Sequence, residues 1–216
     1  MKLYSVDLSP FASRARLAVY AKGLPIDVVA PEGGTKSPEY LALNPMGRVP
    51  CLATDDGVSI PESDTILEYL EDKFPERPLR PASAEDKARA RLLARIGDLY
   101  FTGGAGLFGQ MNPATRDAAA VDKAFADLDN TFSYLERFLG PGPYALGDKL
   151  TTADCSLAPL IFFIGVFGQA FARPNLLAGH PRLAAYAKHL PTDANVQKVY
   201  GEMQKALMER MAAPAS

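Results

Sequence analysis

Residue types that mark metal and redox sites are scarce in this sequence, which has only two cysteines and two histidines among 216 residues. Cys51 and Cys155 lie far apart and form no CxxC pair, so we expect two buried, reduced thiols. His180 and His189 both fall late in the chain. With so few ligands we expect no metal site, and reduced thiols are typical of a cytoplasmic protein.

Excess basic charge is missing as well. The 23 Lys and Arg residues face 25 Asp and Glu residues, and the net charge of −2 argues against nucleic acid or an anionic membrane as a partner. The N-terminus has no pattern of a secretory signal. The longest apolar run, residues 156–171, includes Pro159 and is shorter than the roughly 18 residues of a membrane span, so we expect a buried core helix there.

An alternating pattern fills the first part of the chain. Residues 2–6 and 25–30 are short apolar runs typical of strands, and the segment between them has helical periodicity that Gly23 should end. The residues expected on the buried face of this helix are Ala12, Ala15, Leu17, Ala18 and Val19, whereas those expected to point outward are Arg14, Arg16 and Lys22. The pattern predicts a strand–helix–strand unit with parallel strands.

A hairpin and a second helix follow. Residues 49–60 are typical of two strands that flank a tight Asp56–Gly57 turn, because glycine tolerates the positive φ that such turns need. The next helix should span residues 63–74, and its expected core-facing residues are Ile66, Leu67, Tyr69, Leu70 and Phe74. These elements together predict a small α/β layer fold.

Helical patterns dominate after the segment from Pro75 to Pro81, whose three prolines suit a linker. A helix should begin near Glu85, with a core face made of Ala88, Leu92, Leu93, Ile96, Leu99 and Tyr100. The glycine-rich stretch from Gly103 to Gly109 follows a helix and lacks a closing Gly-Lys-Ser/Thr, so it is not a phosphate loop. We expect a loop or a distorted helix there.

Four further helical segments are expected in the rest of the chain. One should run from about Asp117 to Leu139, with Val121, Phe125, Leu128, Phe132, Leu135 and Leu139 in register. Another should begin at Thr151, where Asp154 is placed to complete a capping box. Shorter helices are expected near residues 181–190 and 195–212.

Ser9 stands before Pro10 at the turn from the first strand into the first helix, where it has three possible roles. It could cap the helix, act as a nucleophile, or donate a hydrogen bond to another group's chemistry. It lacks the Gly-x-Ser-x-Gly elbow of hydrolases. In the smallest α/β redox folds this position is often a cysteine, whose thiolate the helix end stabilises. Serine cannot exchange disulfides, so such a site has either lost that chemistry or uses an imported sulfur.

Five motifs in order resemble those of the cytosolic glutathione transferases, and the resemblance covers essentially the whole chain. They are SPFASRARLAVYAKG (9–23), NPMGRVPCL (44–52), PESDTILEYLEDKFP (61–75), GDKLTTADCSLAPL (147–160) and HPRLAAYAKHL (180–190). The first is similar to the serine-type, tau-like and bacterial members. The resemblance implies a thioredoxin-like domain over residues 1–79, with a mixed four-stranded sheet, and an all-helical domain over residues 85–216. It also implies a homodimer.

The resemblance also implies a glutathione site. Ser9 would donate its hydroxyl proton to the glutathione sulfur, and a cis Val49–Pro50 peptide would present the backbone of Val49 to the cysteinyl residue. Glu62 and Ser63 would hold the γ-glutamyl end. The expected partners of the glycyl carboxylate are Lys36 and Arg48, and the expected walls of a hydrophobic acceptor pocket between the domains are Phe11, Tyr100 and Phe108.

Alternatives remain at this point. Ser9 could serve only as a cap, and Tyr4 or Ser5 could be the catalytic hydroxyl, since other classes use a tyrosine near the end of the first strand. Zeta-like isomerases carry more polar residues where Pro10 and Phe11 stand here. The implied function is a glutathione transferase that attacks a hydrophobic electrophile. The alternatives are a glutathione-dependent isomerase, lyase or dehalogenase, a non-catalytic glutathione or apolar-ligand binder, and an interaction module.

Overall fold

A computed structural model describes residues 1–212 and divides the chain into two compact units. One unit comprises Met1–Arg80 together with the chain from Pro191 onward, and the other comprises Pro81–Leu190. The division after Arg80 lies next to the predicted boundary. The last helix, which we expected in the helical domain, packs with the first unit instead.

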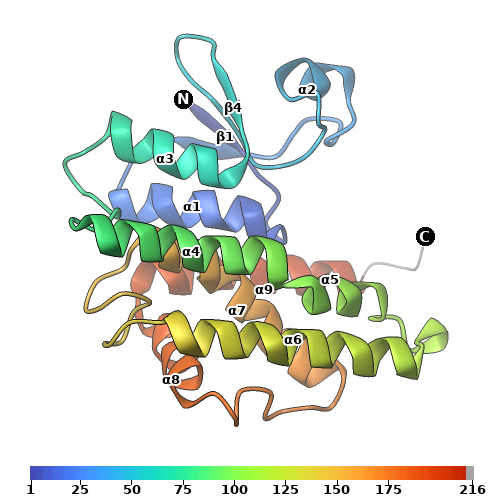
Figure 1. Cartoon of the computed structure of the whole chain (residues 1–216). Coiled ribbons are helices and arrows are strands. Elements are labelled where there is room, and N and C mark those ends of the chain that lie inside the picture. The colour runs from blue at the N-terminus through green and yellow to red at the C-terminus, as the bar shows by residue number, and fades with distance from the viewer. Residues whose placement is uncertain (213–216) are drawn as a thin grey trace. The chain divides into compact units, whose positions relative to one another are not determined.

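The first unit is built on a four-stranded mixed sheet, as predicted (Figure 1). Its strands are β1 (Lys2–Tyr4), β2 (Asp27–Val29), β3 (Cys51–Ala53) and β4 (Ser59–Pro61), in the order β2-β1-β3-β4. The pair β1–β2 is parallel, and the pairs β1–β3 and β3–β4 are antiparallel. The hairpin between β3 and β4 turns at Gly57, which has a φ of 79°.

Four helices accompany this sheet: α1 (Pro10–Lys22), α2 (Pro38–Leu43), α3 (Ser63–Lys73) and α9 (Ala194–Ala212). Helices α1 and α3 pack on each other and against β1 and β3, while α9 packs on α1. The sequence interpretation missed α2, which Ser37 caps and Pro38 begins. In α3, Ile66, Leu67 and Leu70 are buried as predicted, whereas Tyr69 and Phe74, the residue after the helix, are half-buried.

The predicted orientation of the basic residues of α1 is wrong. Arg14, Arg16 and Lys22 are as buried as the apolar face, with exposed fractions of 2%, 0% and 3%. Gly23 ends the helix in the left-handed conformation, as expected. Burial of a charge is costly unless the charge is paired and hydrogen-bonded, and both Arg16 and Lys22 have carboxylate partners.

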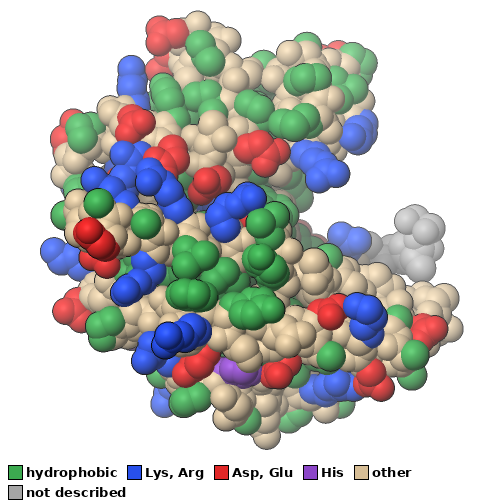
Figure 2. Space-filling model, in the orientation of Figure 1, with side chains coloured by type: hydrophobic (Ala, Val, Ile, Leu, Met, Phe, Trp, Pro, Cys, Tyr) green, Lys and Arg blue, Asp and Glu red, His purple; other side chains and the backbone are tan. Residues whose placement is uncertain are grey.

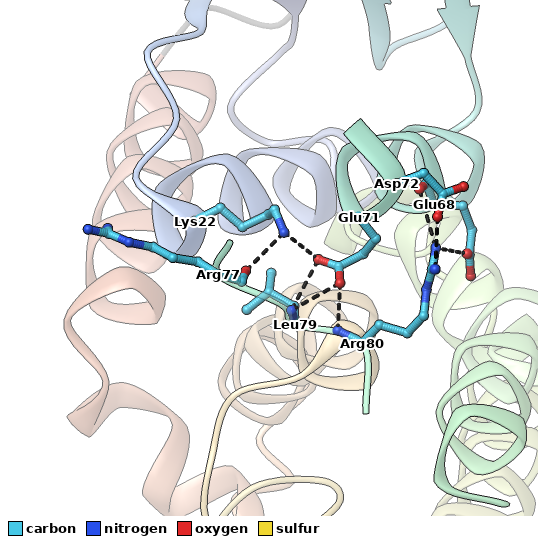
Figure 3. Close-up of polar contacts among 7 residues, drawn as sticks. All are labelled: Lys22, Glu68, Glu71, Asp72, Arg77, Leu79 and Arg80. Carbon is cyan, nitrogen blue, oxygen red and sulfur yellow. Dashed lines mark hydrogen bonds and ion pairs between the residues drawn. The ribbon is translucent and has the colours of Figure 1, made fainter. Parts of the chain in front are cut away.

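Lys22 and Glu71 form a buried ion pair that fastens the segment expected to be a linker (Figure 3). The Lys22 ammonium lies 2.7 Å from the Glu71 carboxylate and donates to the Arg77 carbonyl at 2.9 Å. Glu71 also accepts hydrogen bonds from the backbone N–H groups of Leu79 and Arg80. The proline-rich segment is therefore held firmly against α1 and α3.

The second unit is helical, as predicted. Its helices are α4 (Ala84–Tyr100), α5 (Thr102–Gly109), α6 (Ala118–Phe138), α7 (Thr152–Ala170) and α8 (Pro181–His189), with 3₁₀ turns at Pro113–Thr115 and, at its end, Leu190–Thr192. The predicted face of α6 is confirmed, since Val121, Phe125, Leu128, Phe132, Leu135 and Leu139 are all buried. Thr151 and Asp154 form the expected capping box at the start of α7.

Helix α7 is the apolar run noted in the sequence. It is the one helix among the described residues that is long and apolar enough to cross a membrane, and 72% of its most apolar window is buried inside the structure. Leu157, Phe163 and Phe167 are almost entirely inaccessible. The prediction of a buried core helix is confirmed.

The predicted core face of α4 is rotated from the observed one. The buried residues are Ala90, Leu93, Ala94, Ile96 and Gly97, and the predicted Ala88, Leu92, Leu99 and Tyr100 are exposed. Small residues on the buried side allow close packing, because a Cβ at Gly97 would lie 2.8 Å from the Leu160 side chain. Figure 2 shows apolar side chains on the exposed surface over α4 and the neighbouring α6, and the large ones are Leu92, Leu99, Tyr100, Tyr134 and Phe138.

The glycine-rich stretch is a regular helix, α5, and not the loop or distorted helix that we expected. Gly103 lies directly against α6, where a Cβ would come within 2.1 Å of the Ala124 carbonyl oxygen. Glycine is therefore needed there for the close approach of two helices.

Candidate functional site

One cavity of the first unit brings together most of the predicted glutathione-site residues. It has a volume of about 110 Å³ and is lined by Phe11, Asn44, Arg48, Val49, Pro50, Glu62 and Ser63. These residues come from the start of α1, the segment between α2 and β3, and the start of α3. The cavity thus offers a guanidinium, a carboxylate, backbone polar groups and an aromatic ring within one enclosure.

Ser9 is the N-cap of α1, two residues before Phe11 in the chain. Its Oγ accepts a hydrogen bond from the Ala12 N–H at 3.2 Å, and Pro10 is the first helical residue. Capping uses a lone pair of the oxygen and leaves the hydroxyl hydrogen available as a donor. The cap and the donor are therefore compatible roles for the same side chain.

The competing hydroxyls have other surroundings. Ser5 is 3% exposed, and its Oγ accepts a hydrogen bond from Arg16 at 3.0 Å. Tyr4 packs edge-on against Tyr40 with ring centroids 5.5 Å apart, and it lines a different cavity. Of the three candidate hydroxyls, Ser9 is the one that stands at the N-terminus of α1, two residues before the cavity-lining Phe11, although Ser9 itself is not in the lining.

The loop before β3 contains the expected cis peptide between Val49 and Pro50. Two side chains hold this loop through the Arg48 carbonyl, which accepts hydrogen bonds from Asn44 Nδ2 at 2.8 Å and from the Tyr40 hydroxyl at 2.6 Å. Asn44 is 1% exposed, and its Oδ1 accepts from the Met46 N–H. We did not single out Asn44 from the sequence, although it opens the NPMGRVPCL motif.

The start of α3 is suited to an anion. Glu62 precedes the helix with a φ of 68°, in a region that is uncommon for a residue with a side chain. Among the described residues, no side chain caps the first turn, so its backbone N–H groups are open to a ligand. Ser63, the first helical residue, is 4% exposed and lines the cavity. The Glu62 carboxylate at the same place could bind an ammonium group.

Lys36 lies beside the cavity and not in its lining. The Lys36 ammonium is next to Gly47, where a Cβ would be 2.6 Å from Nζ. Gly47 precedes Arg48 and has a φ of 59°. Lys36 and Arg48 are thus carried by neighbouring stretches of chain, and Arg48 is the one that faces the cavity.

The three predicted aromatic walls fall in different units. Phe11 is 44% exposed and lines the cavity of the first unit. In the second unit, Tyr100 packs edge-on against Tyr134, and Phe108 packs edge-on against Phe163 at 4.7 Å. Tyr100 and Phe108 keep exposed fractions of 50% and 42%, so both retain surface for an apolar ligand.

The cysteines and histidines contribute no site of their own. Cys51 and Cys155 are both buried and form no disulfide, as expected, and burial raises the pKa of the Cys51 thiol. Within residues 1–212, no group of three or more His, Cys, Asp or Glu side chains is placed to hold a metal ion. The neutral, inaccessible Cys51 is a core residue despite its position next to Pro50.

Comparisons with known proteins identify the family. Residues 3–78 match the model of the glutathione S-transferase N-terminal domain, and residues 118–189 match that of the glutathione S-transferase C-terminal domain. Glutathione S-transferase 1 of Dianthus caryophyllus is 35% identical over 185 residues, which cover 82% of this chain and 83% of that protein. The chain belongs to the glutathione S-transferase family and has its glutathione-binding fold.

Relatives with different named activities also match this chain. Maleylacetoacetate isomerase of Pseudomonas aeruginosa is 31% identical over 196 residues, covering 84% of this chain and 92% of that protein. A crystal structure of a glutathione S-transferase from Methylobacterium radiotolerans with glutathione sulfonate has a TM-score of 0.75 and 25% identity, covering 92% and 93% of the two chains. Transferases and an isomerase both match, so the serine-type class stays a prediction.

Proposed function

We propose that this protein is a glutathione transferase in which the Ser9 hydroxyl stabilises the glutathione thiolate for attack on a hydrophobic electrophile. The observation that carries the proposal is the cavity at the starts of α1 and α3. Its lining pairs Arg48, the open start of α3 and the Glu62 carboxylate with the two carboxylates and one ammonium group of glutathione. This charge pattern matches the tripeptide better than a neutral ligand.

Each lining group has one task in this proposal. The start of α3 with Ser63 binds the γ-glutamyl carboxylate, and Glu62 binds the ammonium group. Arg48, with Lys36 beside it, attracts the glycyl carboxylate. Val49 provides backbone hydrogen bonds to the cysteinyl residue. The sulfur then lies toward the N-terminus of α1, where positive helix ends favour an anion.

Ser9 acts on the sulfur by donating a hydrogen bond, which favours the thiolate over the thiol. The sulfur lone pair forms a bond to an electrophilic carbon, and the leaving group departs with its electron pair or, in an addition, the adjacent carbon takes a proton. Phe11, Tyr100 and Phe108 are the proposed contacts of the apolar acceptor. Ser9 remains chemically unchanged throughout.

Substitution of Ser9 tests this role directly. Ser9→Ala should raise the pKa of the bound thiol and lower kcat with an aryl halide about 10- to 100-fold, the range for a lost hydrogen bond to a charged group. Thiolate absorbance as a function of pH and steady-state kinetics measure the two effects. Ser9→Thr keeps both the cap and the hydroxyl, so it should retain most activity. An unchanged thiol pKa in Ser9→Ala would refute the assignment.

A second candidate is glutathione-dependent isomerisation, which the 31% identity to a maleylacetoacetate isomerase favours. Pro10 and Phe11 weigh against it, because they remove polar groups next to Ser9. The same purified protein should be assayed with glutathione and maleylacetoacetate. Isomerisation faster than conjugation across a panel of electrophiles would make isomerase the better assignment.

We further propose that the protein is a homodimer. The exposed apolar surface of α4 and α6 supports this, since Leu99 and Tyr134 are 51% and 43% exposed. Contiguous apolar surface of this kind usually marks an interface. Sedimentation velocity should give a single species near twice the 23.2 kDa chain mass. A species of one chain mass at micromolar concentration would refute the dimer.

A further inference from the structure

Arg16 is a fully buried arginine that reaches back from α1 to the β1–α1 loop. Its exposed fraction is 0%, and it donates to the Ser5 hydroxyl at 3.0 Å, to the Asp7 carbonyl at 2.9 Å and to the Ser13 hydroxyl at 2.9 Å. A further hydrogen bond of 2.5 Å joins it to the Asp7 carboxylate. The planar guanidinium therefore binds the start and the middle of the loop and the first turn of α1 at once.

The loop held in this way carries Ser9. The Ser9 N–H donates to the Val6 carbonyl at 3.0 Å, which closes a turn with Asp7 at one of its two corners. Ser13, one helical turn beyond Ser9, donates its hydroxyl to the Asp7 carbonyl and its N–H to the Ser9 carbonyl. Arg16 thus fixes Asp7, and Asp7 with Ser13 fixes the turn that ends at Ser9.

A second carboxylate forms an ion pair with Arg16, and it comes from the last helix, α9. Arg16 Nε lies 3.1 Å from the carboxylate of Glu202 in α9. The same carboxylate accepts a hydrogen bond from the Tyr20 hydroxyl at 2.9 Å. Burial and this bond raise the pKa of Tyr20, so its hydroxyl stays protonated and continues to donate. Lys198 stands 3.6 Å over the Tyr20 ring and completes the charged surroundings.

We infer that Arg16 is a positioning residue for the thiolate-stabilising hydroxyl, and that Glu202 of α9 holds its guanidinium in the orientation this task requires. The inference rests on the proposed role of Ser9 and adds a dependence of that role on the C-terminal helix. Arg16 does not touch glutathione in this scheme. It sets the direction of the Ser9 side chain through the turn from Val6 to Ser9.

Geometry and through-space charge make opposite predictions for Glu202. If Glu202 acted only as a charge, its neutralisation would remove a negative group and lower the pKa of the bound thiol. If it holds Arg16 in place, neutralisation loosens the loop, weakens the Ser9 hydrogen bond and raises that pKa. Arg16→Lys separates the same causes, because lysine keeps the charge but cannot form the forked set of hydrogen bonds.

The test measures the thiol pKa of bound glutathione in Arg16→Lys and Glu202→Gln, with Ser9→Ala alongside. We expect Arg16→Lys to raise the pKa of the bound thiol by about one unit. At pH values below that pKa, the fraction of glutathione present as thiolate then falls about tenfold. Glu202→Gln should raise it by a smaller amount. In both variants kcat at low pH should fall more than the glutathione KM rises, and higher pH should restore much of the rate.

Glu71→Gln is the matched control. It weakens a different buried ion pair of α1, at Lys22, so it destabilises the same unit without contacting the loop. It should lower the melting temperature and leave the thiol pKa unchanged.

The outcomes separate this inference from the proposed function. A Ser9→Ala shift without a shift in Arg16→Lys, or a lowered pKa in Glu202→Gln, overturns the positioning role alone. No shift in Ser9→Ala overturns the proposed role of Ser9 and this inference with it. Equal shifts in Glu71→Gln and Arg16→Lys would show a general loss of structure and would also overturn the positioning role.

Discussion

Helix α1 carries two buried cations with carboxylate partners, Arg16 at its middle and Lys22 at its C-terminal end, and the two are surrounded differently. Lys22 pairs with Glu71, and their side chains are 1% and 3% exposed. Arg16 is equally inaccessible, but its carboxylate partners Asp7 and Glu202 are 54% and 26% exposed. Lys22 and Glu71 form a closed structural pair, whereas the surroundings of Arg16 open toward the loop that carries Ser9.

The difference shows that burial of a charge does not by itself indicate function. A closed pair with fully satisfied hydrogen bonds contributes to structure, and its removal should affect stability most. A buried cation whose partners lie in a loop next to a site can affect that site, because a shift of the cation moves the loop. Substitutions around Lys22 and around Arg16 should therefore separate effects on stability from effects on chemistry.

Glu71→Ala should have the largest effect on stability. It leaves the Lys22 ammonium buried without its carboxylate and removes the acceptor of the Leu79 and Arg80 N–H groups. Breaking a buried pair in this way costs about 3–5 kcal/mol. Urea unfolding measures the loss. The exposed Asp72, which pairs with Arg80 from the same helix, provides the control, since Asp72→Ala should cost under about 1 kcal/mol.

Lys22→Met should cost less than Glu71→Ala. Glu71 would keep its hydrogen bonds from the backbone of Leu79 and Arg80, so its charge remains partly compensated. We expect a loss of about 1–3 kcal/mol in the same unfolding experiment. A cost equal to that of Glu71→Ala would mean that the ion pair, and not the bonds to the linker, provides the stability.

Tyr20→Phe should have the smallest effect of the three. It removes one hydrogen bond to Glu202 and keeps the ring under Lys198, at a cost of about 0.5–1.5 kcal/mol. The shift in bound-thiol pKa should be smaller than in Glu202→Gln, because the Arg16–Glu202 contact remains. A larger shift would place Tyr20, and not Arg16, at the centre of the network.

Local signals in the sequence predicted the elements whose ends are set by individual residues. Pro10, Gly23 and the Thr151–Asp154 box mark helix ends through backbone effects that do not depend on distant parts of the chain. Asp56–Gly57 marked the hairpin for the same reason. Helix α2 was missed because its six residues are too few to show a helical period.

The faces of helices were harder to predict, because they depend on what lies opposite. Arg16 and Lys22 look like surface residues until Glu202 and Glu71 are placed beside them. In α4, residue size misled the prediction, since the core there accepts small side chains. Gly103 looked like a break in a helix, yet it permits contact with α6.

In the candidate site, too, the residues within local motifs could be predicted and the contacts between distant residues could not. The motif resemblance selected Arg48, Glu62 and Ser63, and the structure places all three around one cavity. Asn44 was within the quoted motif and was overlooked. The link between Arg16 and Glu202 has no signal in a single sequence, because nothing local relates a residue of the first helix to one of the last.

The packing of α9 on α1 has a consequence for synthesis on the ribosome. Tyr20 and Glu202 are 182 residues apart, and at about 5–20 residues per second this distance takes roughly 10 to 40 s to translate. Every residue of the second unit is made in that interval. The segment that contains Ser9 is therefore among the first to leave the ribosome, but its supporting contacts are among the last to form.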